Sequence, residues 1–567
     1  MASLSFFQHY HHHIQRLQYS LRRSSWSLSA VFLALLISLP VLTLLSYLLQ
    51  PNAQVWQHLA STVLPKYIYN SLWLMFGVGS LSLIIGISTA WLVSMCRFPG
   101  RNYLQWALLL PMAIPGYIIA FTYAGLLDPA GIVQTQLRDT FAWQYGDYWF
   151  PEIRSLWGAI VMLSLVLYPY VYLTARAAFL EQSICVLEVS RTLGCTAWRA
   201  FFRIALPLAR PAIVAGLLLA LMETLADFGT VDYFGVPTFT TGIFRTWFGL
   251  GDAAAAAQLA CVLMSFIFIL IVVERISRQG ARYHHTSSRY SELPAYHLKG
   301  VWKLTAISIC LLPVLLGFII PATQLLRWSW QTFSNDAEFH TLIFNSLWLA
   351  SITALLALLL AAALAYGQRL HPSLMVRASL RFAGTGYAMP GTVIAVGVMI
   401  LAGAFDARLD TFWQQLFNEY SPILLSGTFV ALIFAYLVRF LSVSLSTVEA
   451  GLGKIKPSMD DAARALGRRA LPTLLNIHFP LMRGTLLTAL LMVFVDVMKE
   501  LPATLVMRPF NFNTLAVRAY ELASEEQLAA AAPAGLAIVV AGIIPVILIS
   551  YSIQRARPGT HANNITP

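Results

Sequence analysis

Four carboxylates stand inside otherwise apolar segments, and they are the side chains of this sequence best suited to handling a charged substrate. Glu223 and Asp227 lie four residues apart in one such segment. Asp496 and Glu500 repeat this spacing in another. An i,i+4 spacing places each pair on one face of a helix. Carboxylates at membrane depth are costly and by default indicate a polar pathway, and their oxygens are suitable ligands for a hard cation. We take these four residues as the candidate substrate pathway.

A structural role for the same carboxylates is the competing interpretation. Lys499 is close enough in sequence to neutralise Asp496 or Glu500, and Glu223 could hydrogen-bond to a neighbouring helix. Both interpretations stay open at this point, and no metal ligand set is assigned.

The elements that carry these residues are predicted to be membrane-spanning helices. Of the 567 residues 58% are hydrophobic and only 11% are charged, whereas soluble domains carry roughly a quarter charged residues. About 20 mainly apolar residues cross a hydrocarbon core. Such runs occur at 27–49, 67–94, 103–126, 155–180, 209–233, 253–274, 303–327, 342–367, 382–404, 423–446, 483–505 and 528–552. The predicted class is an all-α integral membrane protein with about twelve spans in two six-helix halves.

The distribution of positive charge orients these spans. With the N-terminus inside, the cytoplasmic regions contain 27 of the 37 Lys and Arg residues, which the positive-inside rule favours. The net charge of +12 then reflects topology, and lipid rather than nucleic acid is the expected surrounding. We divide the chain into a cytoplasmic basic leader (1–26), a first six-helix half (27–276), a cytoplasmic linker (277–302), a second six-helix half (303–554) and a cytoplasmic tail (555–567). Both termini are expected in the cytoplasm.

The two halves repeat one another in sequence. Asn70–Leu74 returns as Asn345–Leu349, 275 residues later, and the Pro-Gly pairs Pro115-Gly116 and Pro390-Gly391 have the same spacing. An even number of spans per half gives both halves the same orientation, with a pathway expected at their interface. The Pro-Gly pairs are predicted in the middle of each third span. There they are hinge candidates, and a static kink is the alternative.

A second repeated motif lies in the cytoplasmic segment between spans four and five. An acidic residue is followed by a glycine six residues on, and then by an isoleucine and a proline. The glycine permits a sharp turn at positive φ, and the proline suits the first turn of the next helix. The motif residues are Glu188, Gly194, Ile204 and Pro207 in the first half, and Asp461, Ala462, Ala463, Gly467, Ile477 and Pro480 in the second.

This motif resembles the EAA loop of binding-protein-dependent ABC importer permeases. The first copy departs from the pattern at Val189 and Ser190, and the second has Asp461 in place of glutamate. The resemblance implies a type I permease fold, in which each loop forms a knob that docks into an ATPase subunit. Two knobs imply two ATPase copies. Because the sequence contains no G-x-x-x-x-G-K-[ST] phosphate loop, we expect no ATP hydrolysis and no bound cofactor in this chain; ATP and Mg²⁺ would be used by the partner.

The stretches Glu223–Thr230 and Lys499–Leu505 look like those of fused permeases of ferric-iron importers. That resemblance implies a bacterial inner membrane, a periplasmic iron-binding protein as partner, and Fe(III) as cargo. Two alternatives stay open: an ABC permease for another small periplasmic solute such as a phosphonate, and an ion-coupled secondary transporter. A non-transporting membrane anchor would explain neither the repeat nor the paired carboxylates.

Overall fold

The computed structural model describes residues 29, 31–49, 53–181, 197–279, 296–332, 337–370 and 372–555. Within these residues, twelve helical segments are long and apolar enough to cross a membrane, so the predicted all-α class and number of spans are confirmed. The strands of the described part are the two-residue β1 (Cys96–Arg97) and β2 (Tyr296–His297), which pair in parallel. The leader, most of the linker, the tail beyond Arg555, Glu188 and Gly194 lie outside the described residues.

The helices follow one another in the same general order in both halves. The first half comprises the span Val31–Leu49, which ends in η1 (Tyr47–Leu49), then α2 (Ala53–Thr62), α3 (Leu64–Met95), α4 (Arg101–Ala107), η2 (Leu110–Ala113), α5 (Gly116–Leu127), α6 (Ile132–Phe141), α7 (Leu156–Glu181), α9 (Ala197–Ala200), η3 (Phe201–Ala205), α10 (Leu206–Ala226), α11 (Gly229–Tyr233), α12 (Phe239–Phe248) and α13 (Ala253–Gln279). The second half comprises α14 (Val301–Val314), η4 (Leu315–Ile319), α15 (Ile320–Thr332), α16 (Ala337–Leu370), α17 (Leu374–Ala383), η5 (Gly386–Ala388), α18 (Gly391–Phe417), α19 (Phe429–Gly453), α20 (Pro457–Ala465), α21 (Ala470–Thr473), η6 (Leu474–His478), α22 (Phe479–Met498), α23 (Pro502–Met507), α24 (Leu515–Ser524) and α25 (Leu528–Arg555).

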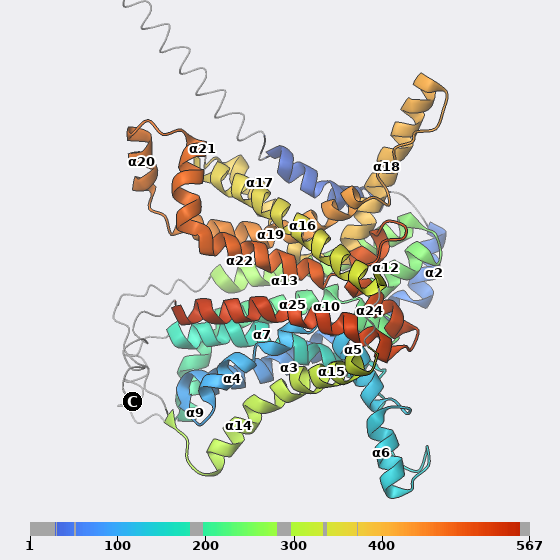
Figure 1. Ribbon diagram of the computed structural model, residues 1–567, viewed down its shortest axis with the longest axis vertical. Helices are drawn as coiled ribbons and strands as arrows, with labels where there is room; N and C mark the ends of the chain where they lie inside the picture. The colour runs from blue at the N-terminus through green and yellow to red at the C-terminus, as the bar shows by residue number, and fades with distance from the viewer. Residues whose placement is uncertain are drawn as a thin grey trace, which may run out of the picture.

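The spans form one bundle with two distinct ends (Figure 1). We call the end that carries α9, α20 and α21 the knob end, and the end that carries α2, α12 and α24 the opposite end. The repeated Asn-Ser-Leu-Trp-Leu motif makes equivalent contacts in both halves. Asn70 Nδ2 donates to the carbonyl of Pro237 at 2.8 Å, and Asn345 Nδ2 donates to that of Asn513 at 3.0 Å.

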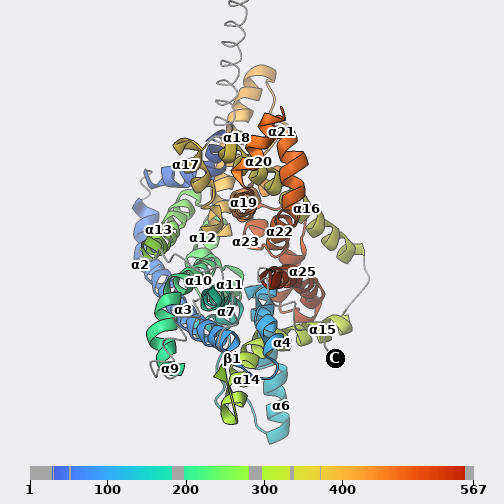
Figure 2. The same ribbon diagram turned by 90° about the vertical axis from the view of Figure 1, so that its left-hand side faces the viewer.

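The outermost spans of each half pack against the other half. The first span crosses α18 so closely that a Cβ added to Gly397 would lie 2.8 Å from the carbonyl oxygen of Pro40. In return α25 packs on η2 and α5, and the Tyr123 phenol of α5 donates to the carbonyl of Leu316 at 2.7 Å. Figure 2 views the bundle from the knob end and shows α14 and α15 against the first half. The halves are therefore interlocked.

Glycines allow close approach between helices inside the first half. A Cβ added to Gly216 of α10 would lie 2.1 Å from Thr174 Oγ1 of α7, and one added to Gly86 of α3 would lie 2.7 Å from Val171 Cβ. Small residues are the usual means of such packing in membranes. α3, α7 and α10 thus form a tightly packed unit that supports one wall of the site.

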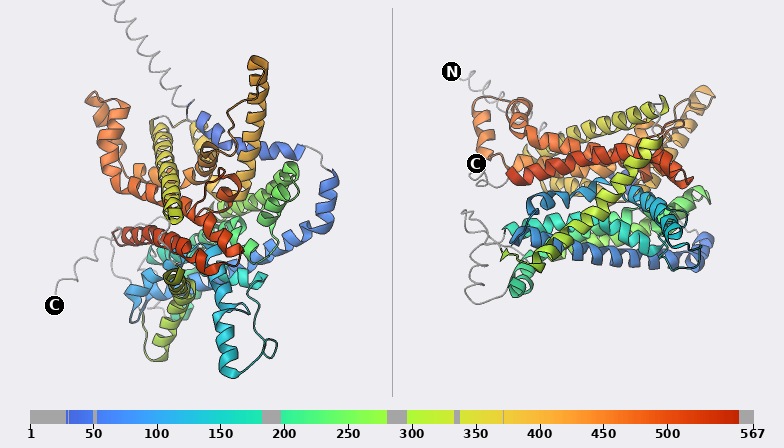
Figure 3. Two further views of the ribbon diagram at one scale, coloured as in Figure 1. Left: turned by 45° about the vertical axis from the view of Figure 1, so that its right-hand side comes forward. Right: turned by 60° about the horizontal axis from the view of Figure 1, so that its bottom comes forward.

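Two arms, α6 and the C-terminal part of α18, project from the opposite end in different directions (Figure 3, left). The α18 arm is closed by Asp406, whose carboxylate accepts hydrogen bonds from the backbone N–H of Leu425 at 2.6 Å and of Ser426 at 2.9 Å. The arms widen the bundle at the end remote from the knobs.

The predicted third spans, 103–126 and 382–404, are wrong as continuous helices. Pro115 and Pro390 are N-caps with extended backbone, and the helices α5 and α18 begin at the glycines that follow them. Proline lacks an N–H donor and disfavours helical geometry at the preceding residue; Ile114 accordingly has φ −96° and ψ 119°. The Pro-Gly pairs thus start helices and do not lie in the middle of one.

The predicted fifth spans, 209–233 and 483–505, also end early. α10 stops at Ala226 and α22 at Met498. Asp227 has an extended backbone, with φ −66° and ψ 131°. The members of each carboxylate pair therefore do not share one helical face, because the second member stands where the helix has ended.

Candidate functional site

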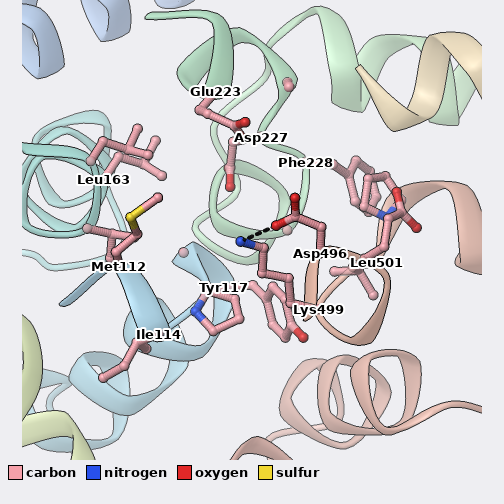
Figure 4. Close-up of a pocket in the computed structure, with 18 of the residues that line it drawn as sticks. Met112, Ile114, Tyr117, Leu163, Glu223, Asp227, Phe228, Asp496, Lys499 and Leu501 are labelled. Atoms are coloured by element: carbon pink, nitrogen blue, oxygen red, sulfur yellow. Dashed lines mark ion pairs between the residues drawn. The ribbon is translucent and has the colours of Figure 1, made fainter. Parts of the chain in front are cut away.

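A central chamber lies between the halves, at the level where α10 and α22 end. It is a cavity of about 130 Å³ lined by residues from α5, α7, α10, α19 and α22 and by the segments that follow α10 and α22. Figure 4 shows side chains from both halves directed into it. The ionisable acidic and basic residues that line it are Glu223, Asp227, Arg439, Asp496, Lys499 and Glu500. The structure therefore brings all four predicted carboxylates to one cavity.

Asp227 and Glu500 have equivalent structural tasks. The Asp227 carboxylate accepts hydrogen bonds from Thr230 Oγ1 at 2.9 Å and from the backbone N–H of Val231 at 3.1 Å. The Glu500 carboxylate accepts from the backbone N–H groups of Ala503 and Thr504, both at 3.1 Å. Each carboxylate satisfies the free N–H groups at the start of a short helix, α11 or α23, where negative charge is favourable.

The glycines of the two Pro-Gly pairs lie against these capping carboxylates. A Cβ added to Gly116 would lie 3.2 Å from Asp227 Oδ1, and one added to Gly391 would lie 2.5 Å from Glu500 Oε1. The structure thus joins two features that the sequence analysis treated separately. The missing Cβ of each glycine leaves room for the carboxylate that caps the neighbouring short helix.

Two cations neutralise two of the four carboxylates. Lys499 Nζ lies 2.9 Å from Asp496 Oδ1, drawn as the dashed line in Figure 4. Arg439 Nη1 lies 2.9 Å from Glu500 Oε1. The structural interpretation of Lys499 therefore holds for Asp496, whereas Glu500 has a partner that sequence reasoning missed. The available signal was a second cation, Arg439, inside a predicted span.

Glu223 differs from the other three carboxylates. It lines the chamber and makes no hydrogen bond or ion pair within the part of the chain that the structure describes. Four carboxylates and two cations leave the chamber wall with a surplus of negative charge, which attracts cations strongly where the surroundings are poorly polarisable. Among the described residues, however, no three His, Cys, Asp or Glu side chains are placed to hold a metal ion.

A larger vestibule of about 470 Å³ adjoins the chamber on its knob side. Its walls include Ser446 and Thr447 of α19 and Pro545 of α25, which lie nearer the knob end than the chamber residues of α19 and α22. The two cavities share five lining residues, which mark their junction: Met112, Tyr170, Tyr387, Asp496 and Lys499.

The chamber is closed toward the opposite end by contacts between the halves. A Cβ added to Gly229 would lie 2.8 Å from the Leu501 side chain of the other half. The Tyr520 phenol of α24 donates to Asp232 Oδ2 of α11 at 2.5 Å. Burial, and after it the negative charge of Asp232, raise the pKa of Tyr520 above its ordinary value, so this phenol keeps the proton that it donates.

A further bridge between the halves, which we call the Arg154 bridge, lies at the same end. Arg154 pairs with Asp128 at 2.8 Å in its own half and with Glu526 at 2.7 Å in the other half. Its guanidinium also lies over the Tyr233 ring, 5.1 Å from the centroid. The molecule is thus sealed at the opposite end, while its cavities extend toward the knob end.

The second-half loop forms a compact helical knob. α20 ends in a turn at Gly467, which has φ +74°. The N–H of Gly467 donates to the carbonyl of Arg464, and that of Arg468 to the carbonyl of Ala463, both at 2.9 Å. This is a Schellman termination, in which glycine is strongly preferred. Gly467 therefore has the left-handed backbone that its position in the motif predicted.

The other motif residues lie around this turn and at the start of the following helix. Asp461 and Ala462 are exposed on α20, and Ala463 is buried. Ile477 lies in η6 and Pro480 in the first turn of α22. In the first half Ile204 lies in η3 and Pro207 in the first turn of α10, which is the corresponding place.

The knob is anchored by Asp460, the neighbour of the predicted acidic residue. Asp460 Oδ2 lies 2.7 Å from Arg369 Nη2 at the end of α16, and Asp460 Oδ1 lies 2.9 Å from His478 Nε2. Arg369 also donates to the carbonyls of Leu452 and Ile455. Sequence reasoning missed this anchor, because the acidic pair gives no sign of which member faces inward.

A bundle of two interlocked helical halves, with a charged cavity between them that is closed at one end, is typical of a membrane transport protein. Residues 82–283 match the family described as binding-protein-dependent transport system inner membrane component. The Fe(3+)-transport system permease protein FbpB 2 of Haemophilus influenzae is 27% identical over 85% of this chain and 89% of that protein.

Other relatives match with different coverage. The ferric transport system permease protein FbpB of Actinobacillus pleuropneumoniae is 24% identical over 79% of this chain and 66% of that protein. The molybdenum transport system permease protein ModB of Escherichia coli is 29% identical over 35% of this chain and 89% of that protein. These matches support a multi-pass inner membrane protein in which residues 82–283 form a binding-protein-dependent transport component, and the similarity to the two iron-transport permeases extends through both halves.

Proposed function

We propose that this chain is the permease subunit of an ATP-driven, binding-protein-dependent importer of ferric iron. The observation that carries the proposal is the similarity to the Haemophilus influenzae Fe(3+)-transport permease, because it extends through both halves and 85% of the chain. The match to the molybdenum transport permease covers only 35% of the chain. A fused pair of halves is thus shared with the iron-transport relative.

The charge of the central chamber supports a cationic cargo. Its wall has four carboxylates against two cations, and Glu223 forms no ion pair within the part of the chain that the structure describes. A relative in Escherichia coli is named a sulfate transport permease, but a sulfate ion would be repelled by this wall. A trivalent cation would be attracted to the same wall.

The knobs are the proposed docking points for two copies of an ATPase subunit. The second knob presents Asp461 with a 72% exposed side chain and Leu466 at 83% exposure. We assign the same role to the first loop through Glu188 and Gly194, which lie outside the described residues.

This assignment makes the knob end cytoplasmic and the opposite end periplasmic, with both termini in the cytoplasm. The cavities then extend toward the cytoplasm, and the sealed end faces the binding protein. ATP-driven closure of the ATPase pair would draw the knobs together and open the sealed end. The binding protein would then release its iron into the chamber, and hydrolysis would restore the present state. The partner subunits hydrolyse ATP, and this chain forms the pathway through the membrane.

The proposal is tested by uptake of radioactive ferric iron in cells that lack the chain but retain its ATPase and binding protein. Wild type should restore uptake, Glu223→Gln should lower it, and the exposed Glu419→Gln should match wild type at equal membrane abundance. Failure of wild type to restore iron uptake would remove ferric iron as the cargo. Equal uptake by the Glu223 variant and wild type would leave iron but exclude Glu223 from the pathway.

A further inference from the structure

Two tyrosines from different halves meet at the junction of the chamber and the vestibule. Tyr170 belongs to α7 in the first half and Tyr387 to η5 in the second, and both line both cavities. Met112, Asp496 and Lys499 complete the set of residues that line both cavities at this junction. A solute that passes from the chamber to the vestibule must therefore pass these phenols.

The phenols adjoin two of the pathway carboxylates. Glu223 and Asp496 line the chamber together with Tyr170 and Tyr387, and Asp496 lines the vestibule with both phenols as well. Glu223 and Asp496 occupy corresponding positions in the two halves, near the ends of α10 and α22. Each half thus contributes one phenol and one carboxylate to the same place.

A third phenol faces the chamber without a partner. Tyr117 lines the cavity, is only 5% exposed, and its hydroxyl makes no hydrogen bond. Buried hydroxyls are nearly always satisfied, so an orphan requires an explanation. A ligand oxygen or a hydrated ion in the chamber would supply the missing partner.

We propose that Tyr170, Tyr387, Glu223 and Asp496 form a four-oxygen site that holds ferric iron as it leaves the chamber. This rests on the proposed function and specifies its substrate class as a hard trivalent cation. Such ions prefer anionic oxygen ligands. The carboxylates alone form no metal-holding group in the described residues, and the phenols supply the missing oxygens.

Binding at this site involves protons but no electrons. Each phenol that ligates the ion releases its proton to water in the vestibule, since a bound metal strongly favours the deprotonated ligand. The phenol regains a proton when the ion departs, and the iron stays ferric throughout. Tyr117, deeper in the chamber, is placed to donate its unused hydrogen bond to a ligand of the incoming ion.

Lys499 keeps the site from binding too tightly. Its ammonium group lies 2.9 Å from Asp496 Oδ1 and interacts with Tyr170. It therefore competes with the metal for one ligand and repels it from the other. A transport site must hold its ion weakly enough to release it, and an internal cation meets that requirement.

The test uses a spectroscopic signature of iron–phenolate bonds together with uptake. The complete transporter, with its ATPase, is reconstituted in lipid nanodiscs and titrated with ferric nitrilotriacetate. The variants are Tyr170→Phe, Tyr387→Phe and both together. Tyr123→Phe is the matched control, because that buried phenol donates to the carbonyl of Leu316 and lines neither cavity.

Wild type and the Tyr123 control should show the visible charge-transfer absorption of ferric phenolate, and the double variant should lack it. Since even supporting groups of a metal site change affinity by about 10–100-fold, each single variant should lower iron affinity at least about tenfold. An unchanged band or normal iron uptake in the double variant would overturn the inference while the proposed function stood. Absence of iron uptake by wild type would instead overturn the proposed function and this inference with it.

Discussion

Replacing Asp460 with alanine should loosen the second knob far more than replacing Asp461 beside it. The Asp460 and Arg369 side chains are only 12% and 17% exposed, and their ion pair is 2.7 Å long. Removing one partner of a buried pair costs about 3–5 kcal/mol. Because Arg369 keeps its bonds to the carbonyls of Leu452 and Ile455, we take the lower figure, about 3 kcal/mol.

The expected contrast follows from exposure. Asp461 pairs with Arg464 at 3.0 Å, but the two side chains are 72% and 63% exposed. Such a helical pair contributes about 0.3–0.5 kcal/mol. At 1.4 kcal/mol per factor of ten, Asp460→Ala should raise the equilibrium constant for local opening of α20, and with it the amide exchange rate, roughly 100-fold, and Asp461→Ala roughly twofold.

Hydrogen–deuterium exchange of α20 peptides in the purified permease measures this opening directly. The double variant Asp460→Leu with Arg369→Met provides a check, because apolar replacement of a whole buried pair is often neutral; it should exchange more slowly than Asp460→Ala. Equal exchange rates for Asp460→Ala and Asp461→Ala would refute the anchoring role.

Three further predictions concern other parts of the molecule. Arg154→Gln removes the partly exposed ion pair to Glu526, which contributes up to about 1 kcal/mol. The ratio of open to closed molecules at the opposite end should therefore rise roughly fivefold, measured as distances between spin labels on the two halves. Gly467→Val forces a β-branched residue to φ +74°, at about 1–2 kcal/mol, and should reduce uptake per ATP hydrolysed. Gly216→Val puts atoms within 2.1 Å of Thr174 Oγ1 and should sharply lower the amount of permease in the membrane.

Each of these has a contrary result. Unchanged distance distributions in the Arg154 variant would mean that other contacts seal the opposite end. Normal coupling of uptake to hydrolysis in the Gly467 variant would dismiss the turn as a coupling element. Wild-type abundance and melting temperature in the Gly216 variant would mean that α10 and α7 separate without cost.

The sequence predicts the spans and the turn at Gly467 because each depends on local properties. A run of about 20 apolar residues predicts a membrane span, because such a run is more stable in lipid than in water. A glycine just after a helix predicts a left-handed turn, because glycine adopts that backbone at little cost. Hydropathy, however, does not predict where a helix ends inside an apolar run. Residues 103–114 are apolar, yet α4 and η2 form there, because Pro115 prevents a helix from continuing through Ile114.

The site was predicted in composition and not in arrangement. Glu223 and Asp227 have the spacing of a helical pair, but Asp227 satisfies the N–H of Val231 and so terminates the helix. Asp227 can cap α11 only because the chain leaves the axis of α10 after Ala226, and the i,i+4 spacing does not predict that change of direction. The pairing of Arg439 with Glu500 is likewise a contact between separate helices, and only tertiary packing selects it.

The exchange of outer helices between the halves has a consequence for synthesis. The span Val31–Leu49 leaves the ribosome first, but α18, against which it packs at Gly397, is translated only after the entire first half. Likewise η2 and α5 are translated long before α25, the last of the described helices, which packs on them. A nascent chain therefore holds unfinished helix surfaces in the lipid until translation ends. Joining both halves in one polypeptide guarantees that the missing surfaces arrive on the same chain.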